Sequence, residues 1–484
     1  HDPGSAPVST VAGSLVATPL GARTLGGATR FQSIDAATSG LTFENRFEWG
    51  HPLERLYPHG WAGGGVAIGD IDGDGRPDLY LTSQTGIDRL YRPTGPLVFV
   101  DVTESAGLAT ESTWGAGASF ADVDGDGDQD LYVCNYDAPN RLYVNDGAGH
   151  FEERAAAAGV AYRGASVMGA FADHDGDGDL DLYLCTNRLY PPGIEDEPEI
   201  EDGPDGTPRI AASAATRFAM QDRPDGGRYV VKAGERDVLY RNDGNGHFED
   251  VTLSAGIDGL HPGLSATWWD HDRDGQPDLY VCNDFWDADR LYHNQGDGTF
   301  VDIAAEALPH TPWFAMGADF ADVDLDGHMD LLAADMAATT HYRSKVMMGD
   351  MNESRWFLES AEPRQYMRNA LYLGTGTGRF LEGAFLSGVA STDWTWSVLF
   401  GDLDADGRPD LFATNGTANH SFDPDLGART REAMAELAAA GVTDPKVAWE
   451  RQWSLYREVP PIAEPNVALR NRGPLDFEHA GESW

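Results

Sequence analysis

A nine-residue loop with four aspartates recurs six times along this chain, and its spacing constrains the fold more than any other feature. In the copy at 122–130 the aspartates occupy positions 1, 3, 5 and 9, and glycine occupies position 6. The first aspartates of successive copies are 52, 51, 97, 52 and 80 residues apart. A repeating unit of about 51 residues that holds several short strands is typical of a β-propeller, in which each unit is one blade.

The loops, numbered 1 to 6 in chain order, predict cation sites. Calcium takes about six to eight oxygen ligands, and glycine lets a short loop curl around the ion. We expect position 7 to contribute only its backbone carbonyl, because its identity varies freely: Arg76, Asp128, Asp179, Gln276, His328 and Arg408. The sequence therefore predicts about six Ca²⁺ sites. Their aspartates are Asp70, Asp72, Asp74 and Asp78; Asp122, Asp124, Asp126 and Asp130; Asp173, Asp175, Asp177 and Asp181; Asp270, Asp272, Asp274 and Asp278; Asp322, Asp324, Asp326 and Asp330; and Asp402, Asp404, Asp406 and Asp410.

Each unit is predicted to hold four strands. An apolar strand of small residues precedes the loop, and a second strand opens with leucine directly after it, as at Leu131. A third strand carries a Leu-Tyr pair, as at 142–143, and ends in a glycine-containing hairpin turn. The fourth strand begins at a phenylalanine: Phe151, Phe248, Phe300, Phe380 or Phe477. The expected fold is an all-β propeller of four-stranded blades over 33–484, after an extended leader or linker over 1–32.

Three insertions lengthen the repeat at one place, between the second and third strands. They cover about 188–236, 336–369 and 416–465. Because they enter at equivalent positions, we expect them to gather on one face of the disc, where repeat proteins commonly place their binding function. The first insertion is rich in proline, glycine and acidic residues and is predicted to be loop, whereas the third contains a helical run over 430–440.

The number of blades depends on residues 33–48, which resemble the stretch 100–108 and are interpreted as a seventh copy of the outer strand. This copy has no inner strands of its own. Propellers often close by pairing strands from both ends of the chain in one blade, which removes open sheet edges. We therefore favour a seven-bladed plan whose seventh blade is incomplete after Trp484. A ring of six blades, with 33–48 added at an edge, is the alternative.

The composition argues against polyanionic partners. The formal net charge is −45, and the aspartates at positions 1, 3, 5 and 9 of the loops supply 24 of the 79 acidic residues, so six divalent cations would still leave −33. This acidity argues against nucleic acid and anionic membranes as partners. No apolar run is long enough for a transmembrane segment. The sequence starts at His1 without an initiator methionine, which suits a processed chain or an expression remnant. Weak calcium loops fill only where calcium is abundant, so we expect an extracellular, cell-surface or periplasmic protein.

The three cysteines, Cys134, Cys185 and Cys282, occupy equivalent places on the strand after the loop. An odd set in register is not a disulfide framework. We expect small buried core residues, with a metal or redox role as the alternative.

The loop-plus-strand units resemble FG-GAP or VCBS-type repeats, the pattern of integrin α-subunit propellers, over about residues 61–484. Other stretches resemble secreted bacterial relatives of the cartilage acidic protein family, which often carry an ASPIC/UnbV segment. These stretches are 335–336, 341–343, 347–352, 365–369, 391–397, 414–416, 465–471 and 482–484. The resemblance implies an extracellular, calcium-loaded propeller that continues with another calcium-loop unit. It carries over only the loop aspartates as functional residues.

No catalytic motif stands out, since the chain lacks a nucleophile elbow, a His-Glu-x-x-His pair and a phosphate-binding loop. The main hypothesis is a secreted or cell-surface binding, adhesion or surface-assembly module for a protein or glycan. The alternative is an extracellular polysaccharide lyase that uses charged and aromatic residues of the insertions. Its candidates are His341, Tyr342, Arg343, Lys345, Arg355, His420 and Asp423. Trp313, Trp356, Trp394 and Trp396 are candidates for stacking on sugars, although aromatics near a propeller axis are more often core.

Overall fold

The computed structural model describes residues 33–480, apart from 47, 49, 57–62, 191–197, 205, 216, 223–226, 349–361, 418 and 421. The predicted leader over 1–32, Arg355, Trp356 and the end at Trp484 lie outside the described residues, and the division of the chain at residue 32 stays a prediction. No helix in the described part of the chain is long and apolar enough to cross a membrane.

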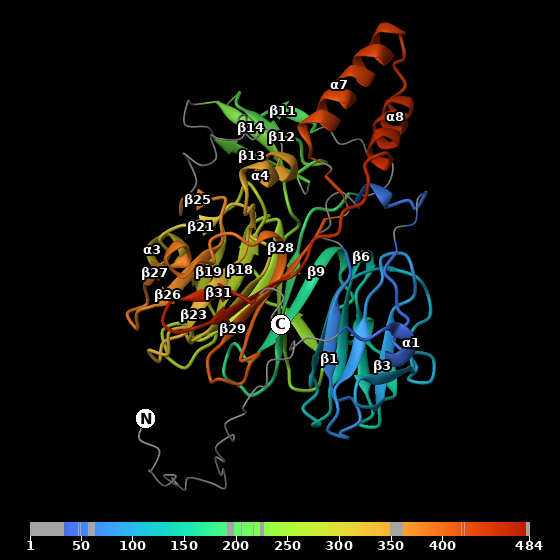
Figure 1. Cartoon of the computed structure of the whole chain (residues 1–484). Coiled ribbons are helices and arrows are strands. Elements are labelled where there is room, and N and C mark those ends of the chain that lie inside the picture. Colours follow the sequence, from blue (N-terminus) through green and yellow to red (C-terminus); the bar gives the residue numbers. More distant parts are fainter. Residues whose placement is uncertain are drawn as a thin grey trace, which may run out of the picture.

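Six antiparallel units of four strands follow one another along the chain (Figure 1). Each unit is a meander in which every strand pairs with the next, and the end of β6 also pairs with β9 of the following unit. This confirms the four-stranded repeat and the phenylalanine that opens each later fourth strand, while the number of blades stays a prediction. The strands are β1 (Val66–Gly69), β2 (Asp78–Leu81), β3 (Arg89–Gly95) and β4 (Val98–Asp101) in unit 1; β5 (Trp114–Ala121), β6 (Asp130–Pro139), β7 (Arg141–Asn145) and β8 (Phe151–Glu153) in unit 2; β9 (Arg163–Ala172), β10 (Asp181–Thr186), β15 (Val238–Asn242) and β16 (Phe248–Asp250) in unit 3; β17 (Gly263–Trp269), β18 (Asp278–Asn283), β19 (Arg290–Asn294) and β20 (Phe300–Asp302) in unit 4; β22 (Ala318–Ala321), β23 (Asp330–Ala333), β26 (Ala370–Gly374) and β27 (Phe380–Glu382) in unit 5; and β28 (Asp393–Gly401), β29 (Asp410–Asn415), β30 (Val467–Asn471) and β31 (Phe477–His479) in unit 6.

The second strands are buried because each unit packs face to face on its neighbours. β10 and β18 are buried at every residue, and they consist largely of the leucine, tyrosine, valine and cysteine that suit a pleated core. Five apolar clusters lie between consecutive units, from the pair of units 1 and 2 to the pair of units 5 and 6. The first strands of consecutive units are also neighbours. The sheets therefore stand side by side as the blades of a propeller do.

The cysteines belong to this core. Cys134, Cys185 and Cys282 are free thiols with no exposed surface, and burial raises the pKa of each thiol. The core interpretation of these residues is confirmed.

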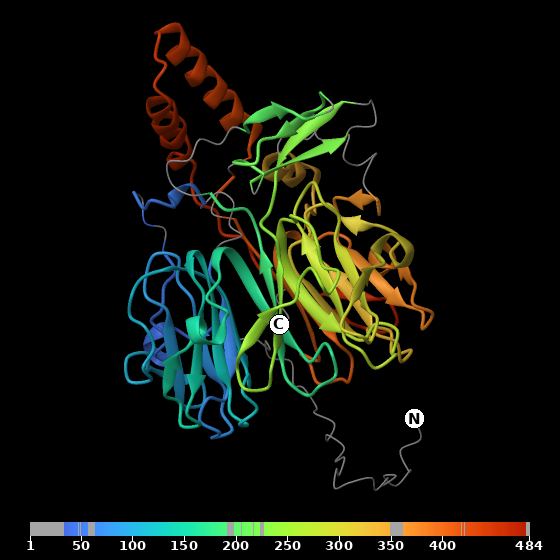
Figure 2. The ribbon, with the colours of Figure 1, turned by 180° about the vertical axis from the view of Figure 1, so that it is seen from behind.

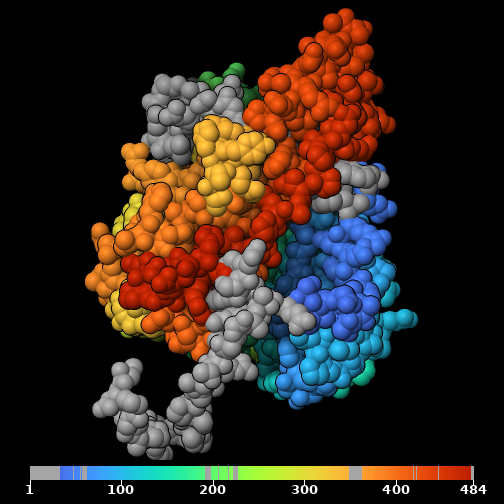
Figure 3. Space-filling model, viewed as in Figure 1, coloured from blue at the N-terminus to red at the C-terminus, as the bar shows by residue number. Residues whose placement is uncertain are grey.

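The three insertions emerge at one end of the sheets (Figures 1 and 2). Unit 3 carries two hairpins, β11 (Ile200–Asp202) with β12 (Pro208–Ile210) and β13 (Phe218–Asp222) with β14 (Arg228–Lys232). Unit 5 carries β24 (Met336–Ala337), α4 (His341–Met348) and β25 (Gln365–Tyr366), and β25 pairs with β21 (Thr311–Pro312). Unit 6 carries the helical hairpin of α7 (Pro424–Ala439) and α8 (Pro445–Arg457). This hairpin projects from the body of the molecule (Figure 3).

An apolar cluster beneath the insertions joins them to the units. It includes Trp114, Trp313 and Trp394 from the units together with Val231 and Met347 from the insertions, all buried. Trp313 and Trp394 are 1% and 3% exposed, which confirms that these two tryptophans are core residues.

Two sequence-based predictions were wrong. The first insertion is not purely loop, because β11 to β14 form two hairpins in which Val231 and Phe218 are buried. The described residues of 33–48 contain no strand: α1 (Ala36–Ser39) is capped by Asp35, which accepts an N–H from Thr38 at 2.8 Å. Gly40 then packs against the carbonyl of Phe99 on β4, and its φ of +75° requires glycine. Gly107, in the turn after β4, packs in the same way against the carbonyl of Phe151 on β8. Residues 33–41 therefore correspond to the turn that follows a fourth strand.

The short helices occupy equivalent turns after fourth strands or precede unit 1. They are η1 (Glu54–Leu56), α2 (Ala155–Ala158), α3 (Ala304–Ala307) and α6 (Ala384–Ser387).

Every connection between second and third strands is closed by the same hydrogen bond. An Asp or Asn just before the third strand accepts a backbone N–H of the second strand at 2.6–3.0 Å, from Asn135 within β6 in unit 2 and from a residue at or just beyond the strand end in the other units. The acceptors are Asp88, Asn140, Asp237, Asp289, Asn369 and Asn466. Because this bond holds the two strand ends together, the connection between them can be short or about 50 residues long without disturbing the sheet.

Candidate metal loops

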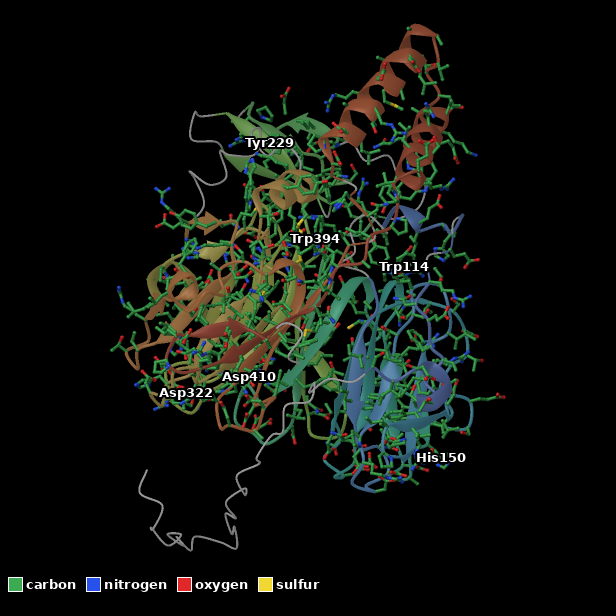
Figure 4. The ribbon with its side chains drawn as sticks, in the orientation of Figure 1. Trp114, His150, Tyr229, Asp322, Trp394 and Asp410 are labelled. Atoms are coloured by element: carbon green, nitrogen blue, oxygen red, sulfur yellow. The ribbon has the colours of Figure 1, made fainter. Side chains whose placement is uncertain are left out.

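The six aspartate loops connect first and second strands at the end of the sheets opposite the insertions, as the labelled Asp322 and Asp410 show (Figure 4). Carboxylate oxygens of positions 1, 3 and 9 lie within 4.8 Å of one another in the first three loops. In loop 4 the corresponding oxygen set is Asp270, Asp272 and Asp274. Several acidic clusters in these repeats are therefore able to hold a metal ion.

The aspartate at position 1 shapes the loop backbone. In all six loops its Oδ2 accepts the N–H of the glycine at position 6, at 2.8–3.0 Å. That glycine has a φ between +80° and +99°, a conformation that side chains other than glycine rarely adopt. The invariant glycine seen in the sequence is thus explained by the turn.

Position 4 also has a positive φ in every loop, which the sequence reasoning missed. Loops 1 to 3 use Gly73, Gly125 and Gly176 there. Loops 4 to 6 place Arg273, Leu325 and Ala405 in the left-handed region, with φ between +58° and +65°. A residue with a Cβ in this conformation stores about 1 kcal/mol of strain, so the loop closure must compensate for it.

The aspartate at position 9 is a buried brace as well as a candidate ligand. Its carboxylate accepts the N–H of position 2 in all six loops, at 2.9–3.0 Å. In loops 2 to 6 it also accepts an N–H from the end of the third strand, for example that of Asn145 onto Asp130 at 2.8 Å. Burial raises the pKa of Asp78 to about 6 and those of Asp130 and Asp330 to about 7.

The aspartate at position 3 gives the clearest sign that the loops suit a cation. Oδ1 of Asp124 and of Asp175, in loops 2 and 3, is buried and has no hydrogen-bond partner, whereas the carboxylate of Asp72 in loop 1 is paired with Arg92. A buried carboxylate oxygen without a partner costs several kcal/mol unless a cation compensates for it. These oxygens belong to the clusters described above, so the donor set fits a hard cation with oxygen ligands.

The residues at position 7 are exposed or half-buried. The backbone N–H of each binds the carboxylate of position 5, at 2.8–3.1 Å. Their role as carbonyl ligands stays a prediction. Asp128 adds a fifth carboxylate to loop 2: its Oδ1 is buried without a partner, and burial followed by repulsion from Asp126 raises its pKa to about 6.

One residue of the third strand makes the loops unequal. It lies next to the strand-end residue that braces position 9, and it is Arg92, Val144, Arg241, His293, Leu373 and Arg470 in units 1 to 6. Arg92 pairs with Asp72, and Arg470 pairs with Asp404, so loops 1 and 6 hold a guanidinium of the chain itself. Arg241 turns away to Glu249, its cross-strand partner, at 2.9 Å. Loops 2, 3 and 5 therefore receive no basic group from this position.

An asparagine belt links neighbouring loops. Nδ2 of Asn145, Asn242, Asn294 and Asn471 donates to the carbonyl of position 2 in the loop of the preceding unit, at 2.7–2.8 Å. In unit 5 the equivalent residue is Gly374, which has no side chain to reach loop 4. A sequence signal for the belt was present, because Asn precedes the hairpin turn in four units.

Two candidate catalytic residues of the insertions, Tyr342 and Arg343, lie in different environments. Tyr342 is 70% exposed on α4. Arg343 is held in ion pairs with Asp393 and with the buried carboxylate of Glu464. The guanidinium of Arg343 thus joins the insertions of units 5 and 6.

The chain matches the family model described as FG-GAP-like repeat at residues 70–133, 122–184, 270–333 and 360–413. Among curated proteins it is similar to cartilage acidic protein 1 of Mus musculus, with 26% identity over 326 residues, which is 58% of this chain and 49% of the relative. The protein of the same name from Xenopus tropicalis is 23% identical over 81% of this chain and 62% of the relative. The chain thus spans about half to three fifths of the length of these relatives.

Two solved structures are more distantly similar. A lectin from Agrocybe aegerita, whose structure concerns recognition of non-reducing terminal N-acetylglucosamine, has a TM-score of 0.42 and 14% identity over 86% of this chain and 78% of its own. The V. cholerae biofilm matrix protein Bap1 has a TM-score of 0.30 and 12% identity over 74% and 66%. The repeat matches and the similarity to cartilage acidic protein 1 agree with the strand order and the loops. The chain belongs to the FG-GAP repeat family of β-propeller proteins.

Proposed function

We propose that this chain is a calcium-loaded β-propeller that acts outside the cytoplasm as a binding or adhesion module for a protein or glycan. The observation that carries the binding role is that exposed aromatic side chains occur on all three insertions. Tyr229 on β14, Tyr342 on α4 and Trp449 on α8 are 47%, 70% and 38% exposed. Tyrosine and tryptophan supply most hot spots of protein interfaces and stack on sugar rings.

The two ends of the sheets would then have separate tasks. The loops stabilise the units at one end, and the insertions present variable surface at the other (Figure 4). The candidate ligands are the loop aspartates together with the position-7 carbonyls, and calcium bound there would neutralise the carboxylates. Self-assembly through the insertion face is a variant of the same function. No observation favours the lyase alternative, because Arg343 already neutralises two carboxylates.

Removing the helical hairpin of unit 6 is expected to abolish partner binding while leaving the propeller folded. Residues 416–465 would be replaced by the five-residue connection 284–288 of unit 4, between Asn415 and Asn466, which already hold the strand ends together. Binding to glycan arrays and to extracellular matrix proteins would be measured with calcium present.

A triple variant Tyr229→Ala, Tyr342→Ala, Trp449→Ala should lose at least tenfold in affinity, since each hot spot contributes about 2 kcal/mol. Leu253→Ala, an exposed site outside the insertions, is the matched control. Unchanged binding by both insertion variants would refute this face as the docking site.

Arg470→Val is expected to improve calcium binding to loop 6. The guanidinium of Arg470 pairs with Asp404, so an incoming calcium ion must displace it or tolerate its charge. Valine is the residue that unit 2 has at this position, at Val144. We expect about one additional calcium ion per chain, or affinity about tenfold tighter at this loop, in native mass spectrometry during a calcium titration. Arg241→Val, which removes the arginine at the same position of unit 3 that pairs with Glu249 and not with its loop, should change nothing. Weaker calcium binding by Arg470→Val would contradict the competition.

A further inference from the structure

Loop 4 differs from the other loops because two imidazoles enter it. His271 occupies position 2, and His293 stands on β19 at the third-strand position described above. One ring nitrogen from each histidine and one oxygen from each of Asp272 and Asp278 lie within 4.8 Å of one another. Nδ1 of His293 is 3.0 Å from Oδ1 of Asp278, and Nδ1 of His271 contacts Oδ2 of the same carboxylate. The set therefore contains two nitrogens and two carboxylates.

The four side chains are held in place and remain accessible from one side. The side chains of His271 and Asp278 are 1% and 0% exposed, whereas those of His293 and Asp272 are 24% and 28% exposed. The His271 ring stacks on Phe380, with 6.0 Å between the ring centroids, and lies edge-on to Trp269, with 6.2 Å between the centroids. Packing thus fixes one imidazole, and the half-buried pair leaves a route for an ion from solvent.

Comparison with the other loops identifies His293 as the distinguishing residue. Loop 3 also has a histidine at position 2, His174, which contacts Asp181 in the same way. Its third-strand residue, however, is Arg241, which pairs with Glu249 and supplies no second nitrogen. Loops 1 and 6 have arginine there, and loops 2 and 5 have Val144 and Leu373.

We propose that loop 4 is a transition-metal site, which binds Zn²⁺ or a similar ion through His271, Asp272, Asp278 and His293. Zinc favours four ligands of nitrogen, sulfur or oxygen, and neutral imidazole is the commonest nitrogen ligand, whereas calcium requires a shell of oxygens. The oxygen set of loop 4, made of Asp270, Asp272 and Asp274, shares Asp272 with this site. The two sets therefore compete for one carboxylate. The proposal is independent of calcium binding by the other loops.

The experiment is a zinc titration of the full chain in millimolar calcium, with bound metal counted by native mass spectrometry. We expect one zinc ion per chain that excess calcium does not displace. His293→Val and His271→Val, which copy Val144 and Val123 of unit 2, should each weaken zinc binding at least tenfold. His174→Val, the matched change in loop 3, should leave it unchanged. Co²⁺ provides a second readout, because a four-coordinate site with nitrogen ligands gives intense visible absorption that six-coordinate cobalt lacks.

The outcomes are decisive in either direction. Zinc retained with equal affinity by His293→Val, zinc displaced by calcium, or only weak six-coordinate cobalt absorption would each overturn the proposal. Thermal melts of the variants in calcium establish that they fold, and a variant that melts like the parent but loses zinc supports the site.

Discussion

Chelating calcium is expected to lower the melting temperature of this protein by about 10 °C or more. A bound ion whose free concentration is a hundredfold above its dissociation constant stabilises the folded state by about 2.7 kcal/mol. Loops 2, 3 and 5, which receive no basic side chain from the third strand, would together contribute about 8 kcal/mol, comparable with the whole stability of a typical domain. The apo protein must in addition keep buried carboxylates such as those of Asp124 and Asp128 close together without a counter-charge.

The measurement is a pair of melts, followed by circular dichroism or calorimetry, in millimolar calcium and in EGTA. Magnesium serves as the control because it demands a small octahedral shell and should restore little of the lost stability. Equal melting temperatures in calcium and EGTA would show that the loops are not structural calcium sites, and the proposed function would then lose its cofactor.

The repeat and its four strands could be read from the sequence because each depends on local order. Aspartates at fixed spacing, a leucine after the loop and a phenylalanine after the hairpin turn all recur at short range, and these features predicted the strands of six units. The helix over 430–440 was predicted for the same reason, and it forms the later part of α7.

The features that sequence reasoning missed depend on contacts between segments far apart. Arg470 reaches Asp404 across 66 positions, whereas the chemically identical Arg241 is captured by Glu249 on the next strand. The sequence places both arginines at the same motif position, and each faces a glutamate on the fourth strand, Glu249 or Glu478. They differ because Glu478 pairs with Arg472, whereas Glu249 pairs with Arg241 itself. Residues 33–48 were misread for a related reason, since the motif they share with 100–108 extends from a strand into the following turn, and the described part forms the turn.

The double role of position 9 is equally invisible in the motif. Four aspartates at positions 1, 3, 5 and 9 look equivalent as oxygen donors. In the structure Asp130 is 1% exposed and accepts the N–H groups of Val123 and Asn145, whereas Asp124 leaves one oxygen without a partner. Asp130 therefore braces the fold without any cation, whereas Asp124 has a free oxygen that a cation would bind.

In the absence of calcium, Asp130→Ala is therefore expected to lower the free energy of unfolding, whereas Asp124→Ala is expected to leave it unchanged or raise it. In EGTA, Asp130→Ala should destabilise the protein by about 2–6 kcal/mol, because it leaves two buried N–H groups without an acceptor, at a cost of about 1–3 kcal/mol each. Asp124→Ala in EGTA should leave stability unchanged or raise it, because it removes one carboxylate from a cluster of like charges. In saturating calcium both variants should be destabilised, since each loses a ligand. Urea unfolding in the two buffers measures all four values. If Asp130→Ala were harmless in EGTA, position 9 would be a ligand only, and the stability of the apo loop would have to come from the position-1 carboxylate and the glycine turn.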